Sequence, residues 1–233
     1  MPAPSLQPFG DNIWTVDGST VSIGGFHYPT RMAVMKLADG GLFIWSPVAV
    51  SEDLRPQLSA IGEVRFIVAP NSLHHLFLKD WQSAYPNARL YAAPGLRTRR
   101  ADIDFNEDLD EKPAPGWASE IDQVLMHGNL ITTEAVFFHR TSGTVLFTDL
   151  LQNFRPGWFT GWRAIIARLD RLIGAEPDVP QKFRVAFVGR AAARAALARI
   201  LAWPAEKVLM AHGTPIQQNG AAFVRRAFRW LSA

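Results

Sequence analysis

The chain contains no cysteine. This absence excludes disulfide bonds, cysteine-ligated zinc, iron–sulfur clusters and a thiol nucleophile. No uninterrupted run of about 18 apolar residues is present either, so no transmembrane helix is expected. Residues 1–16 lack a basic segment followed by an apolar one, so no signal peptide is expected. We therefore expect a cytoplasmic protein.

Several catalytic signatures are also missing. The sequence has no G-x-S-x-G nucleophile elbow, no phosphate-binding P-loop, no G-x-G-x-x-G after a strand and no H-E-x-x-H zinc helix. The acidic run at 102–108 resembles the start of a calcium-binding loop. However, Glu107 stands where that loop needs glycine, and Pro113 stands where it needs a bidentate glutamate. The run is therefore interpreted as a solvated loop.

The composition is that of a globular protein with a substantial core. Of the 233 residues, 48% are hydrophobic, and 8 Trp and 15 Phe supply large side chains. No repeat or linker divides the chain, so residues 1–233 are expected to form a single domain. The net charge of +3 is unevenly distributed, since residues 151–233 contain 13 Lys and Arg against 4 Asp and Glu. Most of these arginines fall on expected helices without an aromatic–basic motif, so nucleic acid is not expected as a partner.

Short apolar runs separated by turn residues predict an α/β protein. Strands are expected within 12–50, with a hairpin turn at 38–41, and at 63–70, 88–94, 124–128, 133–140, 143–150 and 207–211. Helices are expected at 51–62, within 71–86, and at 162–174, 189–201 and 221–231. The helix at 162–174 has an apolar face typical of packing on a core. Residues 97–122 lack apolar periodicity and are expected to form a surface loop, while the strand–helix–strand order at 63–94 predicts a parallel crossover.

Side chains that can bind metals follow several of the expected strands. His74 and His75 follow the strand at 63–70, and His127, Asp149 and His212 each end another strand. Neutral imidazole and carboxylate groups are the usual ligands of zinc and iron in hydrolytic sites. We therefore predict that these strand ends meet at one site. Each residue alone could instead cap a helix, bind a turn carbonyl or pair with an arginine.

The two remaining histidines are not assigned as ligands. His139 lies within an expected strand, and His27 lies in an expected turn, where it could rim a pocket.

In chain order, these segments resemble the metallo-β-lactamase-like hydrolases. The segments that carry the resemblance are "EVRFIVAPNSLHH", "VLMHGN", "VLFTDL" and "LMAHGTPI", and "LHHLFLKDWQSAYPNARLYAAPGL" is similar to the DUF4336 branch of that superfamily. The resemblance covers nearly the whole chain. It implies a four-layer αββα sandwich of the metallo-β-lactamase type.

The metal-binding motif of that family, H-x-H-x-D-H, is incomplete in this chain. If His75 aligns with the final histidine, Pro70 and Ser72 replace the first two histidines and His74 replaces the aspartate. The resemblance then implies one divalent transition metal, Zn or Fe, instead of two.

The resemblance also implies a role for each candidate residue. The metal ligands would be His74, His75, Asp149 and His212. His127, left without a metal of its own, would orient a water molecule or act as general base, so His127 and Asp149 are the expected catalytic residues.

The implied function is metal-dependent hydrolysis of a small ester, thioester, lactone or lactam by a metal-bound water. Three alternatives stay open. The chain could be a non-catalytic member of the fold with a structural metal or none, an iron-dependent oxygen or redox enzyme, or a nucleic-acid-processing enzyme suggested only by the basic C-terminal part. The expected partner is a small-molecule substrate, and no membrane partner is expected.

Overall fold

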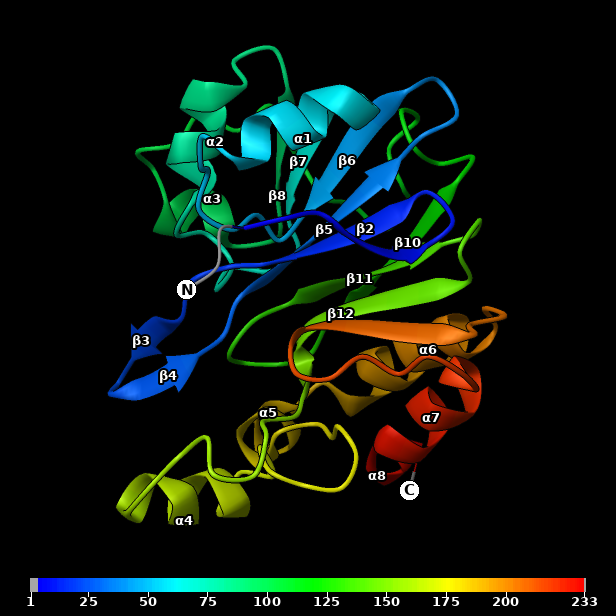
Figure 1. Ribbon diagram of the computed structural model, residues 1–233. Helices are drawn as coiled ribbons and strands as arrows, with labels where there is room; N and C mark the ends of the chain where they lie inside the picture. Colours follow the sequence, from blue (N-terminus) through cyan, green and yellow to red (C-terminus); the bar gives the residue numbers. More distant parts are fainter. Residues whose placement is uncertain (1–3, 233) are drawn as a thin grey trace.

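The computed structural model describes residues 4–232 and shows two β-sheets packed face to face, with helices on both outer faces (Figure 1). Helices from the first half of the chain cover the first sheet, and helices near the C-terminus cover the second (Figure 1). This is the αββα sandwich predicted from the sequence. Within residues 4–232, the structure contains no helix with the length and apolar character that a membrane crossing requires.

The first sheet has the strand order β1-β2-β5-β6-β7-β8-β9. Its strands are β1 (Gln7–Gly10), β2 (Ile13–Asp17), β5 (Arg31–Lys36), β6 (Gly41–Trp45), β7 (Glu63–Ala69), β8 (Arg89–Ala92) and β9 (Glu107–Asp108). From β1 to β6 the neighbours are antiparallel, and from β6 to β9 they are parallel. The parallel connections contain α1 (Leu54–Ile61), α2 (Leu78–Ala84) and α3 (Leu96–Arg99), which confirms the predicted crossover at 63–94.

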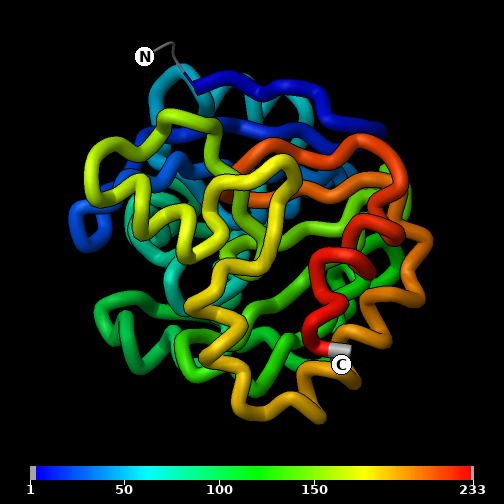
Figure 2. The backbone as a smooth tube through the Cα atoms, turned by 90° about the horizontal axis from the view of Figure 1, so that it is seen from below, coloured from blue at the N-terminus to red at the C-terminus, as the bar shows by residue number. Residues whose placement is uncertain are grey.

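The second sheet has the order β10-β11-β12-β13, and β12 and β13 are parallel. Its strands are β10 (Ile121–Met126), β11 (Glu134–His139), β12 (Thr144–Gln152) and β13 (Lys207–His212). The helices of this half are α4 (Trp162–Leu169), α5 (Gln181–Ala186), α6 (Arg190–Leu201), α7 (Gly220–Ala227) and α8 (Arg229–Ser232). A separate hairpin of β3 (Val21–Ile23) and β4 (Phe26–Tyr28) lies beside the segment that contains α4, although the two are far apart in sequence (Figure 2).

Aromatic side chains fill the space between the two sheets. Phe43 of β6 meets Trp117 and Phe137 with ring centroids 5.0 and 5.6 Å apart, in edge-to-face arrangements. Every residue of β6 is buried, because alternate side chains point to opposite faces and both faces are covered. Phe43 therefore joins the layer between the sheets, whereas Ile44 joins the layer beneath the helices.

The surface loop expected at 97–122 is partly wrong. This segment contains most of α3, all of β9 and the start of β10, and five of its large apolar side chains are buried: Ile103, Phe105, Leu109, Trp117 and Ile121. Ile103 and Phe105 join the core beneath the helices, whereas Leu109, Trp117 and Ile121 join the layer between the sheets, so the segment has no single apolar face. Isolated buried residues of this kind leave no periodic signal in the sequence.

The helix expected at 162–174 also differs from the prediction. It ends at Leu169, and two residues later Arg171 has a positive φ of 58°, a conformation that stops an α-helix. Its apolar face points away from the core for most of its length. The exposed side chains on it are Trp162, Ile165, Ile166 and Leu169.

His139 on β11 is fully buried. Its Nδ1 lies 2.8 Å from the hydroxyl of Ser142, and its Nε2 has no hydrogen-bond partner within the described chain. Burial lowers the pKa of His139 from 6.5 to about 4, because the charged imidazolium would lose its hydration. The native imidazole is therefore neutral.

The buried His139 predicts a pH dependence of stability. Between pH 6.5 and about 4 the unfolded chain binds more protons at this residue than the folded chain does. The free energy of unfolding should therefore fall as the pH decreases through this range, by roughly 3 kcal/mol from His139, and this contribution should be complete above it. Urea unfolding of wild type and His139→Gln across the range measures the effect.

The matched control is His27→Gln, since His27 is exposed on β4. This variant should keep the wild-type pH dependence, whereas His139→Gln should show a flatter one. An unchanged slope in His139→Gln would contradict the buried neutral imidazole.

Candidate metal centre

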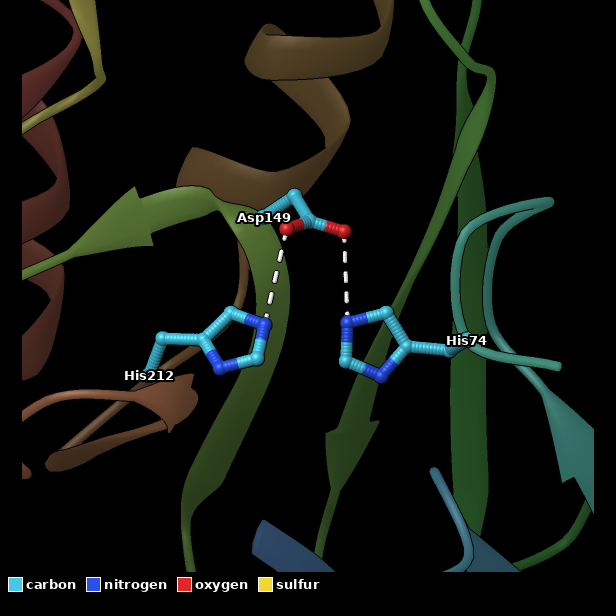
Figure 3. Close-up of side chains that lie close together, drawn as sticks. All are labelled: His74, Asp149 and His212. Atoms are coloured by element: carbon cyan, nitrogen blue, oxygen red, sulfur yellow. Dashed lines mark ion pairs between the residues drawn. The ribbon is translucent and has the colours of Figure 1, made fainter. Parts of the chain in front are cut away.

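Three side chains from distant parts of the chain converge at one edge of the sandwich. Ligating atoms of His74, Asp149 and His212 all lie within 4.8 Å of one another. Nε2 of His74 is 3.2 Å from Oδ2 of Asp149, and Nε2 of His212 is 3.5 Å from Oδ1 of the same carboxylate (Figure 3). The structure thus brings together three of the residues singled out in the sequence.

Strand geometry places these residues. Asp149 lies in β12, and His212 ends the neighbouring parallel strand β13, where it pairs with Gln152. His74 lies in the loop between β7 and α2. After His212, Gly213 has a φ of 151°, and a Cβ there would come within 2.8 Å of the backbone of Asn153. Glycine is required at this position so that the end of β13 can pack closely against the chain that leaves β12.

Asn71 links the His74 loop to the carboxylate. Its fully buried side chain accepts hydrogen bonds through Oδ1 from the backbone N–H groups of Leu73, at 2.8 Å, and His74, at 3.1 Å. Its Nδ2 donates to Oδ2 of Asp149 at 2.7 Å. Asn71 therefore fixes the turn that presents His74 and also orients Asp149.

Glu134 at the start of β11 braces the strand that carries Asp149. Its carboxyl oxygens accept N–H groups of Thr148 and Asp149, each at 2.8 Å. Burial, followed by the neighbouring charge of Asp149, raises the pKa of Glu134 to about 7. Burial opposes ionisation of Asp149 as well, but His74 and His212 beside it hold the pKa of Asp149 well below its ordinary value. Asp149 is therefore the carboxylate of the centre.

The outer nitrogen of each imidazole is held by a hydrogen bond. Nδ1 of His212 lies 2.7 Å from the carbonyl oxygen of Pro29 and must donate, because a carbonyl only accepts. Nδ1 of His74 lies 2.7 Å from Oγ of Ser46, whose hydroxyl donates to the carbonyl of Arg31 at 3.2 Å. When the serine proton is directed to Arg31, Nδ1 of His74 donates to Oγ of Ser46.

Nε2 of each ring faces the carboxylate, either as the N–H of an imidazolium, whose charge and hydrogen bond lower the pKa of Asp149, or as the lone pair of a neutral ring. Lone pairs facing a negative charge at 3.2 and 3.5 Å repel one another unless a proton or a cation lies between them. Ligand atoms around tetrahedral zinc, with bonds of about 2.1 Å, are separated by roughly 3.4 Å. The spacing and chemistry of the three groups therefore fit a divalent transition metal.

The three residues line a cavity of about 380 Å³. Its wall includes the apolar side chains Leu73, Leu76, Phe77, Ile131 and Phe183. Tyr28 of β4 packs edge-on against His212, with ring centroids 5.6 Å apart. The candidate centre is therefore open to a small molecule on one side and enclosed by β-structure on the other.

His75 and His127 lie outside the cluster. His75 lines the cavity, but its Nδ1 lies 3.2 Å from Nη1 of Arg100, because adjacent residues of the turn project in different directions. Burial, followed by the charges of Arg99 and Arg100, lowers the pKa of His75. His127 is half exposed, and its Nε2 pairs with Glu111 at 2.7 Å, away from the cavity. The structure thus places three of the four predicted ligands together, and the roles predicted for His75 as a ligand and His127 as a base stay predictions.

Sequence reasoning missed three residues that organise the centre: Ser46, Asn71 and Glu134. The sequence does carry a signal for two of them. Glu134 is a lone charge at the start of the apolar strand "EAVFF", and an asparagine two residues before Leu73 is typical of a turn. Ser46 follows a buried strand without any such signal, since its role depends on the position of His74.

The family model described as "Domain of unknown function (DUF4336)" matches residues 10–158. The chain belongs to the DUF4336 family. No curated protein matches the chain.

Solved structures match the chain over almost its whole length and show that this DUF4336 protein has the metallo-β-lactamase fold. A metallo-beta-lactamase from Pontibacter korlensis has 11% identity and a TM-score of 0.63, covering 98% of this chain and 99% of that chain. The FIM-1 metallo-beta-lactamase from Pseudomonas aeruginosa, in its mono-zinc form, has 13% identity and a TM-score of 0.62, covering 98% and 96%. The metal-soaked Flv1 flavodiiron core from Synechocystis sp. PCC6803 has 13% identity and a TM-score of 0.63, covering 99% and 62%.

The cluster predicts a link between metal and stability. Zn²⁺ or Fe²⁺ should raise the free energy of unfolding, by about 3 kcal/mol at a hundredfold excess over the dissociation constant, because the three ligands meet only in the folded chain. Asp149→Asn and His212→Ala should lose this stabilisation. Thermal unfolding with metal and with chelator, beside elemental analysis, measures it.

His127→Ala provides the control, because this imidazole lies outside the cluster. It should be stabilised by metal as much as wild type is. Equal stabilisation of wild type and Asp149→Asn would show that the metal binds elsewhere.

Proposed function

We propose that the chain is a metal-dependent hydrolase that acts on a small ester, thioester, lactone or lactam. The supporting observation is the pair of imidazole nitrogens that face one buried carboxylate on the wall of a cavity. In this proposal His74, Asp149 and His212 hold one divalent metal, Zn or Fe. The bound metal would supply the positive charge that activates a water molecule and polarises the carbonyl of the substrate.

The number of ligands favours a catalytic ion over a structural one. Catalytic zinc sites usually have three protein ligands and an open position, whereas structural sites have four. His74, Asp149 and His212 provide three, and they face a cavity instead of a closed core. His75 on the same wall is directed to Arg100 and leaves that side open.

Neighbouring groups fix the direction of each ligand before any substrate enters. Asn71 donates to one oxygen of Asp149, and Gln152 donates to the other at 3.2 Å. Ser46 and the carbonyl of Pro29 hold the two rings. Ligands held in this way bind a metal more tightly and do not need to reorganise during a reaction.

The cavity wall supports an apolar acyl group as the part of the substrate next to the centre. Leu73, Phe77 and Phe183 are among the side chains that line it. Such a wall excludes water from the acyl group and leaves the metal centre as the polar region that a carbonyl oxygen can approach.

Hydrolysis assays test this proposal. The protein loaded with Zn²⁺ or Fe²⁺ is assayed against chromogenic esters, thioesters, lactones and lactams. We expect turnover of at least one class, lost by more than about a hundredfold on chelation or in His212→Ala, because the metal contributes several kcal/mol to the reaction.

In the same assay His127→Ala should retain wild-type turnover. Stoichiometric metal without turnover of any class would favour a non-catalytic role. Oxygen consumption by the iron form alone would favour redox chemistry on this fold.

Asn71 tests the positioning argument. Asn71→Ala removes the acceptor that shapes the His74 turn and the donor to Asp149, so metal affinity should fall by roughly 10- to 100-fold. The control is Asn129→Ala, since Asn129 makes a similar turn by accepting from Ile131 N–H at 2.9 Å but does not contact the three ligands. Titration against a competing chelator measures both affinities.

Both variants should lose stability, by about 1–3 kcal/mol, because each leaves buried backbone groups unpaired. Only Asn71→Ala should lose metal affinity. Equal loss of affinity in both variants would show a general effect of destabilisation and not a positioning role.

A further inference from the structure

Helix α4 presents its apolar side to solvent. Exposed fractions are 54% for Trp162, 64% for Ile165, 43% for Ile166 and 72% for Leu169, and Trp158 just before the helix is 40% exposed. The spacing of the helical four places them on one face. We call Trp162, Ile165, Ile166 and Leu169 the α4 face. A contiguous exposed apolar face of this kind marks an interaction site.

The opposite side of α4 is firmly attached to the protein. Ala167 is fully buried in a small cluster with Phe154, Phe159 and Leu172. Phe26 of the β3–β4 hairpin meets Phe159 with ring centroids 5.4 Å apart. The α4 face is therefore held outward by a packed base and is not the result of a loosely placed helix.

The surroundings of the α4 face are basic. Residues 154–174 contain four arginines and a single acid, Asp170, which pairs with Lys182 at 3.0 Å. Arg163 lies over the ring of Trp162 at 4.6 Å, and Arg155 and Arg168 are exposed and make no ion pair within residues 4–232. Cations flank the apolar face, and no free acid balances them within this segment.

We propose that the α4 face binds the surface of an anionic lipid bilayer. A helix with tryptophan and aliphatic side chains on one side and arginines at its flanks can place the apolar side chains among the acyl chains and the guanidinium groups among the lipid phosphates. The sequence analysis expected no membrane partner because no apolar run is long enough to span a bilayer, but a helix that lies on the bilayer surface needs no such run.

A second copy of the chain fits the α4 face less well. A two-fold contact would place the same patch against itself and bring the arginines of both copies together. Anionic lipid instead complements these charges. The β3–β4 hairpin beside α4 also exposes Ile23, which is 58% exposed and lines the cavity of the metal centre. The proposed membrane surface is thus next to the entrance of the cavity.

Vesicle co-sedimentation of the whole protein tests this proposal. We expect binding to phosphatidylcholine vesicles that contain phosphatidylglycerol, weak binding to phosphatidylcholine alone, and release at high salt. Ile165→Ser with Leu169→Ser should lower the partition coefficient by roughly tenfold or more. Circular dichroism and thermal unfolding confirm that the variant is folded, as expected for exposed positions.

The matched control is Val185→Ser with Val188→Ser, because these side chains are 72% and 65% exposed and lie outside the α4 face. This variant should bind vesicles as wild type does. Absence of binding, equal binding to both kinds of vesicle, or equal loss in both variants would overturn the proposal. A dimer seen by light scattering that Ile165→Ser with Leu169→Ser dissolves, without vesicle binding, would assign the α4 face to self-association.

Discussion

The centre of this protein depends on a carboxylate buried at the edge of a β-sandwich. Asp149 is removed from water, so its charge must be compensated by neighbouring groups. Asn71 and Gln152 donate hydrogen bonds to it, and two imidazoles face it with nitrogens whose orientation is set from behind. A proton on either ring, or a metal ion held as proposed above, would supply positive charge beside the carboxylate. The loop after β7 and the ends of β12 and β13 are arranged to satisfy this condition.

The sequence predicted the layers of the fold and part of the site, for a physical reason. Buried strands of a covered sheet are nearly continuous apolar runs, so a polar side chain at the end of such a run is conspicuous. Asp149 and His212 stand out in this way, and the parallel strands β12 and β13 bring them to one edge; His74 lies in the loop that follows the buried strand β7 of the other sheet. The resemblance to the metallo-β-lactamase-like hydrolases added the order of the layers, which the fold confirms.

The other features of the site could not be predicted, because they depend on the directions in which side chains point and on contacts between residues far apart in the sequence. Residue spacing does not show that His75 turns toward Arg100, which lies 25 positions away in the chain, or that His127 pairs with Glu111. Asn71 acts through hydrogen bonds to residues far along the chain. The apolar period of α4 predicts which side chains share one face of the helix. It does not predict whether that face packs on the core or points to solvent, because helices packed on a core and helices on a membrane surface have the same period.

The β3–β4 hairpin connects the two unusual features of the structure. Its inner end leads to Pro29, whose carbonyl holds His212, and Phe26 packs against the base of α4. Its strands also provide Tyr28 and Ile23 to the wall of the cavity. An amphiphile that reaches the cavity from a bilayer would therefore pass along a surface that is already apolar, from the α4 face over the hairpin to the centre. A substrate fully dissolved in water gains nothing from such a path. Burial of apolar surface away from water would thus favour two steps: attachment of the α4 face to a bilayer, and movement of the apolar part of an amphiphile into the cavity beside Asp149.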